Sequence, residues 1–74
     1  MELKTIYHLF SECWKFYKKY HDRQFDEAIW EQVLKDGRAL HVKYQKAVFA
    51  REMILAVISE LERIDRRKIN QEDL

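Results

Sequence analysis

The stretch from Ala47 to Ile64 constrains the fold more than any other part of this chain. Its apolar residues recur three and four positions apart, which is the spacing of one face of an α-helix. No residue between Met53 and Ile58 is polar, so this turn of the helix is apolar on all sides. A helix of this kind is normally covered by neighbours on more than one side. We therefore expect the other elements to pack around a helix over residues 47–67.

Helices are expected almost throughout the rest of the chain. The 74 residues include no proline and a single glycine, and these two residue types disfavour helix interiors. Apolar residues at helical spacing predict two further helices, at about residues 3–20 and 24–44, separated by a break at His21-Asp22-Arg23 with Asp22 as the N-cap. The predicted fold is an all-α, three-helix antiparallel bundle over residues 1–68, followed by a mobile C-terminal tail at 69–74.

The second break, at Tyr44-Gln45-Lys46, has no glycine, proline or capping side chain. One continuous helix from Gln24 to Arg67 is therefore an alternative, which would make the fold a dimeric helical hairpin with a long second helix. We prefer a turn at this point, because uncapped helices longer than about 25 residues usually belong to coiled coils or membrane spans.

The three helices are expected to share one core. Gly37 lies within the apolar face of the second helix, and we interpret it as a point of close approach, where a ring, for example one from the first helix, packs against bare backbone. The predicted core residues are Phe10, Cys13, Trp14, Tyr17, Trp30, Val33, Leu40, Ile54, Val57 and Leu61.

The third helix carries more apolar residues than one chain is expected to cover. A 74-residue chain is also near the lower size limit for a self-sufficient core, and its one cysteine excludes an internal disulfide. We therefore predict a homodimer with two-fold symmetry. The residues expected to mediate self-association lie off the core stripe, in two pairs on different sides of the helix, and are Val48 with Leu55 and Phe49 with Ala56.

Residues with the pattern of a catalytic, cofactor or metal site are missing from the sequence. Cys13, the one thiol, lies on an apolar helix face, where a small buried side chain is the expected role. The three histidines do not have helical metal-ligand spacing, and one glycine cannot form a phosphate-binding loop. We predict that the protein is not an enzyme and uses no cofactor.

Basic residues gather at the expected ends of the first and third helices. Parallel first and third helices would bring these ends to one pole of the bundle, where the cations could bind nucleic acid or an acidic protein. The alternative interpretation is that they simply stabilise helix C-termini. The residues of this basic pole are Lys15, Lys18, Lys19, Arg23, Arg63, Arg66, Arg67 and Lys68.

A first helix rich in tryptophan and tyrosine, followed by "FDEAIWEQV" and "ILAVISELERI", resembles small uncharacterised helical proteins encoded on bacterial mobile elements and prophages. The resemblance covers most of the chain. It implies a bacterial accessory protein, such as an inhibitor that binds a host protein, and it brings no functional residue with it.

The sequence therefore predicts a protein-interaction or regulatory module, and a small nucleic-acid-binding protein is the alternative. Formal net charge is +1, which argues against a partner selected by bulk charge. The longest apolar run is too short to span a bilayer, so no membrane association is expected. A lone cysteine and the lack of a signal peptide predict a cytoplasmic protein.

Overall fold

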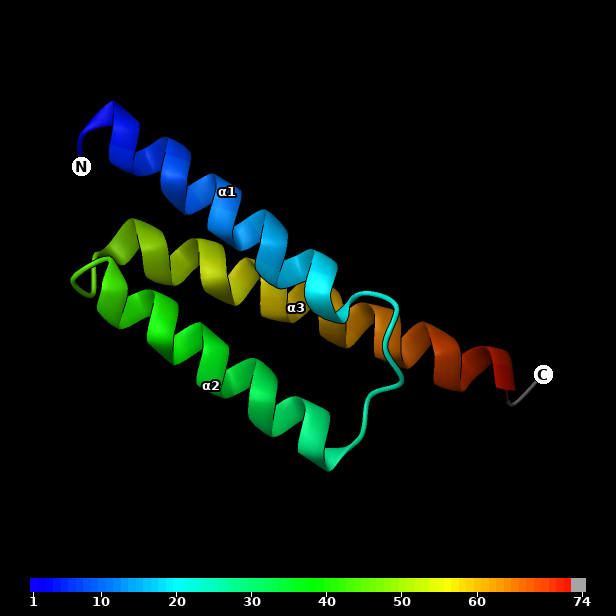
Figure 1. Cartoon of the computed structure of the whole chain (residues 1–74). Coiled ribbons are helices and arrows are strands. Elements are labelled where there is room, and N and C mark those ends of the chain that lie inside the picture. Colours follow the sequence, from blue (N-terminus) through cyan, green and yellow to red (C-terminus); the bar gives the residue numbers. More distant parts are fainter. Residues whose placement is uncertain (73–74) are drawn as a thin grey trace.

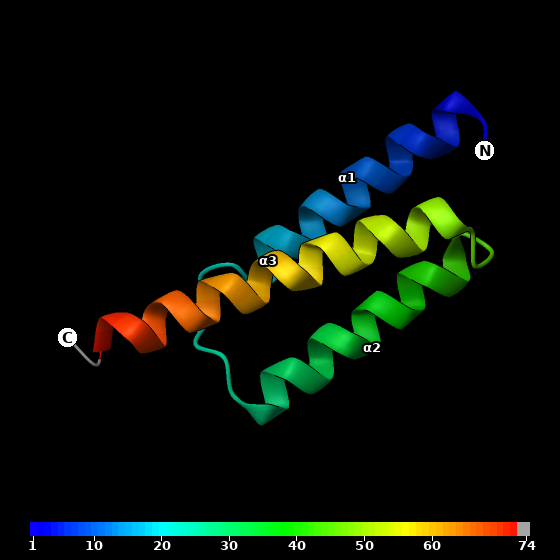
Figure 2. The same cartoon turned by 180° about the vertical axis from the view of Figure 1, so that it is seen from behind.

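Three helices follow one another along the chain: α1 (Leu3–Tyr20), α2 (Glu27–Lys43) and α3 (Val48–Glu72). They are seen in a computed structural model that describes the backbone of residues 1–72 and the side chains of residues 1–67. The chain runs up, down and up, so α1 and α3 are parallel and α2 is antiparallel to both (Figures 1 and 2). The predicted all-α three-helix bundle is confirmed, and the alternative of one helix from Gln24 to Arg67 is wrong.

The start of α2 lies three residues later than predicted, because Asp26 rather than Asp22 is its N-cap. The Asp26 carboxylate accepts a hydrogen bond from the backbone N–H of Ile29 at 2.8 Å. Phe25, just before the cap, stacks on Trp30 with ring centroids 4.7 Å apart. This pair is a hydrophobic staple, which fixes the direction in which the chain enters the helix.

The two helices that flank α3 both pack along it, and they approach each other at few points. Figures 1 and 2 show the last turns of α3 extending past the ends of α1 and α2. The sequence predicted that this helix ends near Lys68, but its backbone remains helical to Glu72. The last two residues of the predicted tail, 73–74, lie outside the part of the chain that the structure describes.

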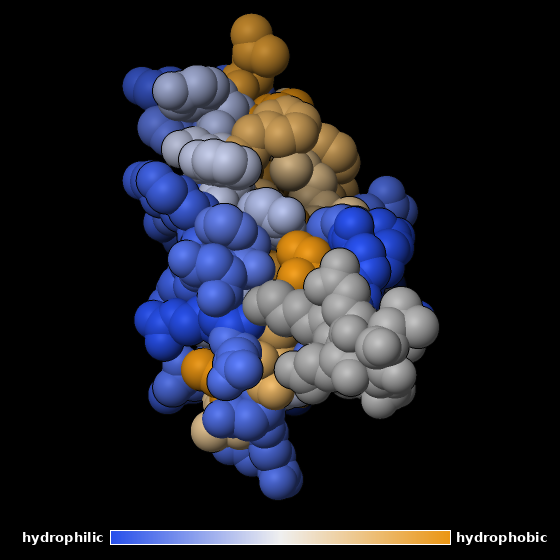
Figure 3. Space-filling view, turned by 90° about the vertical axis from the view of Figure 1, so that its right-hand side faces the viewer, coloured by the Kyte–Doolittle hydropathy of each residue, from blue (hydrophilic) through white to orange (hydrophobic). Residues whose placement is uncertain are grey.

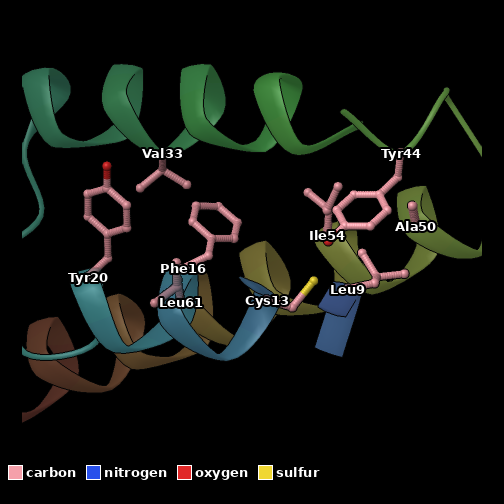
Figure 4. Close-up of a cluster of buried hydrophobic side chains, with 9 residues drawn as sticks. All are labelled: Leu9, Cys13, Phe16, Tyr20, Val33, Tyr44, Ala50, Ile54 and Leu61. Atoms are coloured by element: carbon pink, nitrogen blue, oxygen red, sulfur yellow. The ribbon is translucent and has the colours of Figure 1, made fainter. Parts of the chain in front are cut away.

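The buried core lies between the three helices (Figure 4). Of the predicted core, Cys13, Val33, Ile54 and Leu61 are buried, and several others pack partly buried against them. Two predictions are wrong, because the side chains of Phe10 and Trp14 are 52% and 61% exposed. On α1, Leu9, Phe16 and Tyr20 are buried instead. Among residues 1–67, the buried core residues are Leu9, Cys13, Phe16, Tyr20, Val33, Tyr44, Ala50, Ile54 and Leu61.

Gly37 is the point of close approach that the sequence predicted. A Cβ atom built on it would lie 3.2 Å from Cγ2 of Ile54, 3.5 Å from Cδ1 of Ile58 and 3.8 Å from Cζ of Phe16. The expected ring of α1 is therefore present, but the tightest neighbour is an isoleucine of α3. A larger residue at this position would push α2 away from α3.

Candidate functional site

A row of large apolar side chains lies exposed along α1 on the surface of the protein. Leu3, Tyr7, Phe10 and Trp14 follow one another at steps of four, three and four residues, so they share one face of the helix. Tyr7 is 69% exposed, and the other three are each more than half exposed. With Phe49 of α3, these residues form a surface that we call the aromatic face.

Contacts between rings join the two helices at this face and extend it. Phe10 meets Phe49 edge to face, with centroids 6.0 Å apart and ring planes at 77°. Further along α1, Trp14 stacks on Tyr17 at 6.2 Å, and Tyr17 stacks on His21 at 5.7 Å. The rings therefore support one another and present a continuous surface. Figure 3 shows apolar surface beside surface of intermediate hydropathy, as expected for phenylalanine next to tyrosine and tryptophan.

The structure divides the predicted self-association residues between two surfaces. All four are exposed. Phe49 belongs to the aromatic face through its contact with Phe10, whereas Leu55 lines a groove between α2 and α3. One residue of each predicted pair is thereby placed, Phe49 at the aromatic face and Leu55 in the groove. Tyr7, Phe10 and Trp14 were missed as surface residues, because their spacing equals that of the buried stripe beside them.

Two polar bridges connect α1 to α2 and fix the rotation of α1 about its axis. At one bridge, Glu12 accepts hydrogen bonds from the Lys43 ammonium group and the Tyr44 hydroxyl. At the other, Asp36 accepts hydrogen bonds from Lys19 at 2.9 Å and from the Tyr20 hydroxyl at 2.5 Å. In both bridges a carboxylate is held by one lysine and one tyrosine, with the partners on opposite helices. This rotation places the aromatic face on the outside.

The bridges shift the pKa values of their members. Burial raises the pKa of Glu12, but hydrogen bonds from Lys43 and Tyr44 outweigh burial, and the pKa lies below its usual value. The pKa of Asp36 is lowered in the same way, with Tyr20 and Lys19 as donors overcoming the effect of burial. Burial together with the hydrogen bond to Glu12 raises the pKa of Tyr44 to about 12. Both carboxylates are therefore ionised at neutral pH, and each is paired.

The residues of the predicted basic pole have different surroundings on α1 and on α3. Lys15 and Lys19 line a groove between α1 and α2, whereas a shallow hollow beside Arg63 is formed by residues of α3 alone. The α3 arginines pair within their own helix: Arg63 and Arg67 with Glu60, and Arg66 with Glu62 at 3.5 Å. The side chain of Lys68 lies outside the described residues. The positive charge at this end of α3 is thus largely neutralised locally.

Features of catalytic or metal chemistry are not apparent in the described part of the chain. Cys13 is buried, and burial together with the charge of Glu12 raises the pKa of its thiol, which disfavours the reactive thiolate. Among residues 1–67, no three histidine, cysteine, aspartate or glutamate side chains come together as they would around a metal ion. No described helix combines the length and apolar character needed to cross a membrane.

No family model, no curated protein and no solved structure matches this chain. Among the described residues, the aromatic face gathers five exposed apolar side chains on two adjacent helices.

Proposed function

We propose that this chain is a non-enzymatic protein-interaction module that binds through the aromatic face. The observation that carries this proposal is the exposure of Tyr7, Phe10 and Trp14 on one side of α1. Contiguous exposed apolar patches mark interaction sites on soluble proteins, and aromatic residues are enriched at the centres of such interfaces. The bridges at Glu12 and Asp36 hold α1 in this orientation, so the surface is formed before a partner arrives.

A second copy of the chain is the partner that the spacing favours. Residues 3, 7, 10, 14, 17 and 21 alternate by four and three, which is the pattern of the contact positions in paired helices. Exposed rings and a leucine, each burying on the order of 100 Å² or more, give several hundred Å² per chain. That approaches the roughly 800 Å² per partner of a stable interface. We therefore propose a homodimer that pairs α1 with α1 about a two-fold axis, in place of the sequence-based interface that included Leu55 and Val48 of α3.

A cytoplasmic accessory protein of a bacterial mobile element fits this module, and the role is suggested by the resemblance of the sequence to such proteins. A host protein would then be a further partner of the same face. The lone buried cysteine is compatible with a reducing compartment.

The oligomeric state tests the proposal. We expect sedimentation velocity at micromolar concentration to give twice the chain mass of 9.2 kDa. Replacing both Phe10 and Trp14 by glutamate should yield monomers, because burying unpaired carboxylates costs several kcal/mol, about 2 or more for each. Leu55→Glu, which lies outside the aromatic face, is the matched control and should leave the dimer intact.

Two results would contradict the dimer through this face. One is a wild-type chain that sediments as a monomer at all accessible concentrations. The other is a dimer that survives Phe10→Glu with Trp14→Glu and dissociates on Leu55→Glu, which would place the interface on the α2–α3 side. Circular dichroism of each variant checks that the helices are retained.

Nucleic-acid binding through the basic pole is the second candidate function. The α3 arginines of that pole are paired with Glu60 and Glu62, which leaves fewer free cations for phosphates. We therefore rank it below protein binding. Phosphate contacts weaken steeply with salt, so the absence of binding to duplex or single strands at low salt would remove this candidate.

A further inference from the structure

A second apolar depression lies on the other side of α3, between α3 and α2. It encloses about 190 Å³, and Gly37 and Ile54 lie among the residues that line it. We call it the α2–α3 groove, and its walls are formed by Leu34, Arg38, His41, Arg51, Leu55 and Ile58.

The two walls of the groove carry matching apolar side chains. Leu34 of α2 is 45% exposed, and Leu55 of α3 is 48% exposed. Ile58 adds a half-buried apolar surface beside them. The lining is thus suited to aliphatic side chains of a partner, and it contains no phenylalanine, tyrosine or tryptophan on which a nucleic-acid base could stack.

Each wall also carries one arginine. Arg38 belongs to α2 and Arg51 to α3, and neither guanidinium group forms an ion pair or hydrogen bond with a described residue. The arginines of α3 that lie nearer its end behave differently, since Arg63, Arg66 and Arg67 are all paired with glutamates. No acidic side chain lines the groove. Two unpaired guanidinium groups therefore flank an apolar depression.

His41 lies in the same wall as Arg38. Its Nε2 atom is shielded from solvent and has no hydrogen-bond partner among the described residues. Most buried polar atoms in folded proteins do have a hydrogen-bond partner. In the free chain, the α2 wall of this groove therefore contains one buried nitrogen whose hydrogen bond is missing.

We propose that the α2–α3 groove binds an acidic amphipathic segment of a partner protein. Aliphatic side chains of the segment fill the space between Leu34, Leu55 and Ile58. Carboxylates on either side of them pair with Arg38 and Arg51, because a guanidinium group binds a carboxylate through two parallel hydrogen bonds. The groove is separate from the aromatic face, so its occupancy does not depend on the dimer.

A synthetic peptide is the probe for this site. It is a helical peptide with two leucines four residues apart, glutamates flanking them and a fluorescent label at one end. We expect fluorescence anisotropy to show saturable binding with a Kd on the order of 10–100 μM, as for a small interface. Arg38→Glu with Arg51→Glu should weaken binding about tenfold or more, because attraction becomes repulsion.

Matched controls separate this site from general charge attraction. Lys35→Glu changes an exposed cation of α2 outside the groove. It should leave the Kd for the peptide within about twofold of the wild-type value. Peptides with alanine in place of both leucines, or lysine in place of the glutamates, should bind about tenfold more weakly or worse. The Phe10→Glu, Trp14→Glu variant should bind the peptide like wild type, so failure of the dimer and failure of this proposal are distinguishable.

Three results would overturn the proposal. The first is no saturable binding of the acidic peptide up to about millimolar concentration. The second is binding that the Arg38→Glu, Arg51→Glu variant retains in full while its circular dichroism matches wild type. The third is displacement of the peptide by a single-stranded oligonucleotide that binds more tightly through the same two arginines, which would make the groove a phosphate site.

Discussion

Gln45 and Lys46, between α2 and α3, have backbone φ angles of 58° and 56°. This left-handed region is normally occupied by glycine, because side chains there crowd the backbone. The N–H groups of both residues donate to carbonyls in the last turn of α2, Gln45 to Val42 at 2.9 Å and Lys46 to His41 at 2.8 Å. That pair of bonds is the Schellman motif, which ends a helix. The turn is therefore specified by backbone hydrogen bonds rather than by residue type.

Gln45→Gly should stabilise the protein, because glycine adopts a positive φ without steric cost. We expect the free energy of unfolding in urea to rise by about 1 kcal/mol. Gln45→Ala is the control and should give no such gain, since alanine keeps the Cβ atom that causes the crowding. Equal stabilities for the glycine and alanine variants would show that the turn is unstrained.

At the scale of the helices, α1 has two candidate apolar faces, and its contacts with α2 select between them. Leu9, Cys13, Phe16 and Tyr20 face the core, with Glu12 and Lys19 on the flank that faces α2. Tyr20 is buried, and its hydroxyl still reaches Asp36. Turning α1 to bury Phe10 would withdraw these groups from their partners. The Glu12 and Asp36 bridges thus favour an outward aromatic face.

The bridges predict a loss of stability in acid. The folded pKa values of Glu12 and Asp36 lie below their ordinary values of 4.5 and 3.8, so the unfolded chain binds protons first as pH falls. The stabilisation is complete above about pH 5 and is lost as pH falls through the folded pKa values. Glu12→Gln with Asp36→Asn should lower stability at about pH 7, by about 1 kcal/mol, and flatten the loss between about pH 5 and pH 3.

Urea unfolding at several pH values measures this effect. Glu31→Gln with Glu52→Gln removes two exposed carboxylates outside both bridges, and this control variant should keep the acid dependence of wild type. If the bridge variant and the control lose stability equally in acid, the two bridges do not hold α1 in place.

At the scale of the whole molecule, a small core supports a long central helix. The protein measures 47 × 20 × 18 Å, and the long dimension follows α3. The fully buried residues lie on all three helices, with Leu9 on α1, Val33 on α2 and Leu61 on α3. Each of them carries a large share of the packing, because a domain of this size has few others.

Leu61→Ala or Ile54→Ala should therefore destabilise the folded protein severely. We expect each to lower the free energy of unfolding by about 2–5 kcal/mol, through lost burial and the cavity that remains. A domain of this size is stable by only about 5–15 kcal/mol, so thermal unfolding should shift clearly downward. Leu55→Ala, at a half-exposed position of the same helix, is the control and should cost less than about 1 kcal/mol. Similar losses at Leu61 and Leu55 would contradict the observed packing.

Local patterns in the sequence determined the helices and much of their arrangement. The bounds of α1, the break after Tyr44 and the close approach at Gly37 were all predicted, because spacing and special residues act over a few positions. The cap of α2 was placed at Asp22 instead of Asp26, since both aspartates precede an apolar run and only the bond to Ile29 distinguishes them.

Tertiary structure alone decided which face of α1 is buried. The stripe through Leu9 and the stripe through Phe10 have the same spacing and similar apolar content, so periodicity cannot rank them. The choice depends on partners 16 to 32 residues away, at the bridges from Tyr20 to Asp36 and from Tyr44 to Glu12. The folded arrangement also leaves the side chains of Arg38 and Arg51 without an ion-pair partner among the described residues. Each of these features depends on which side chains the folded helices bring within hydrogen-bond reach.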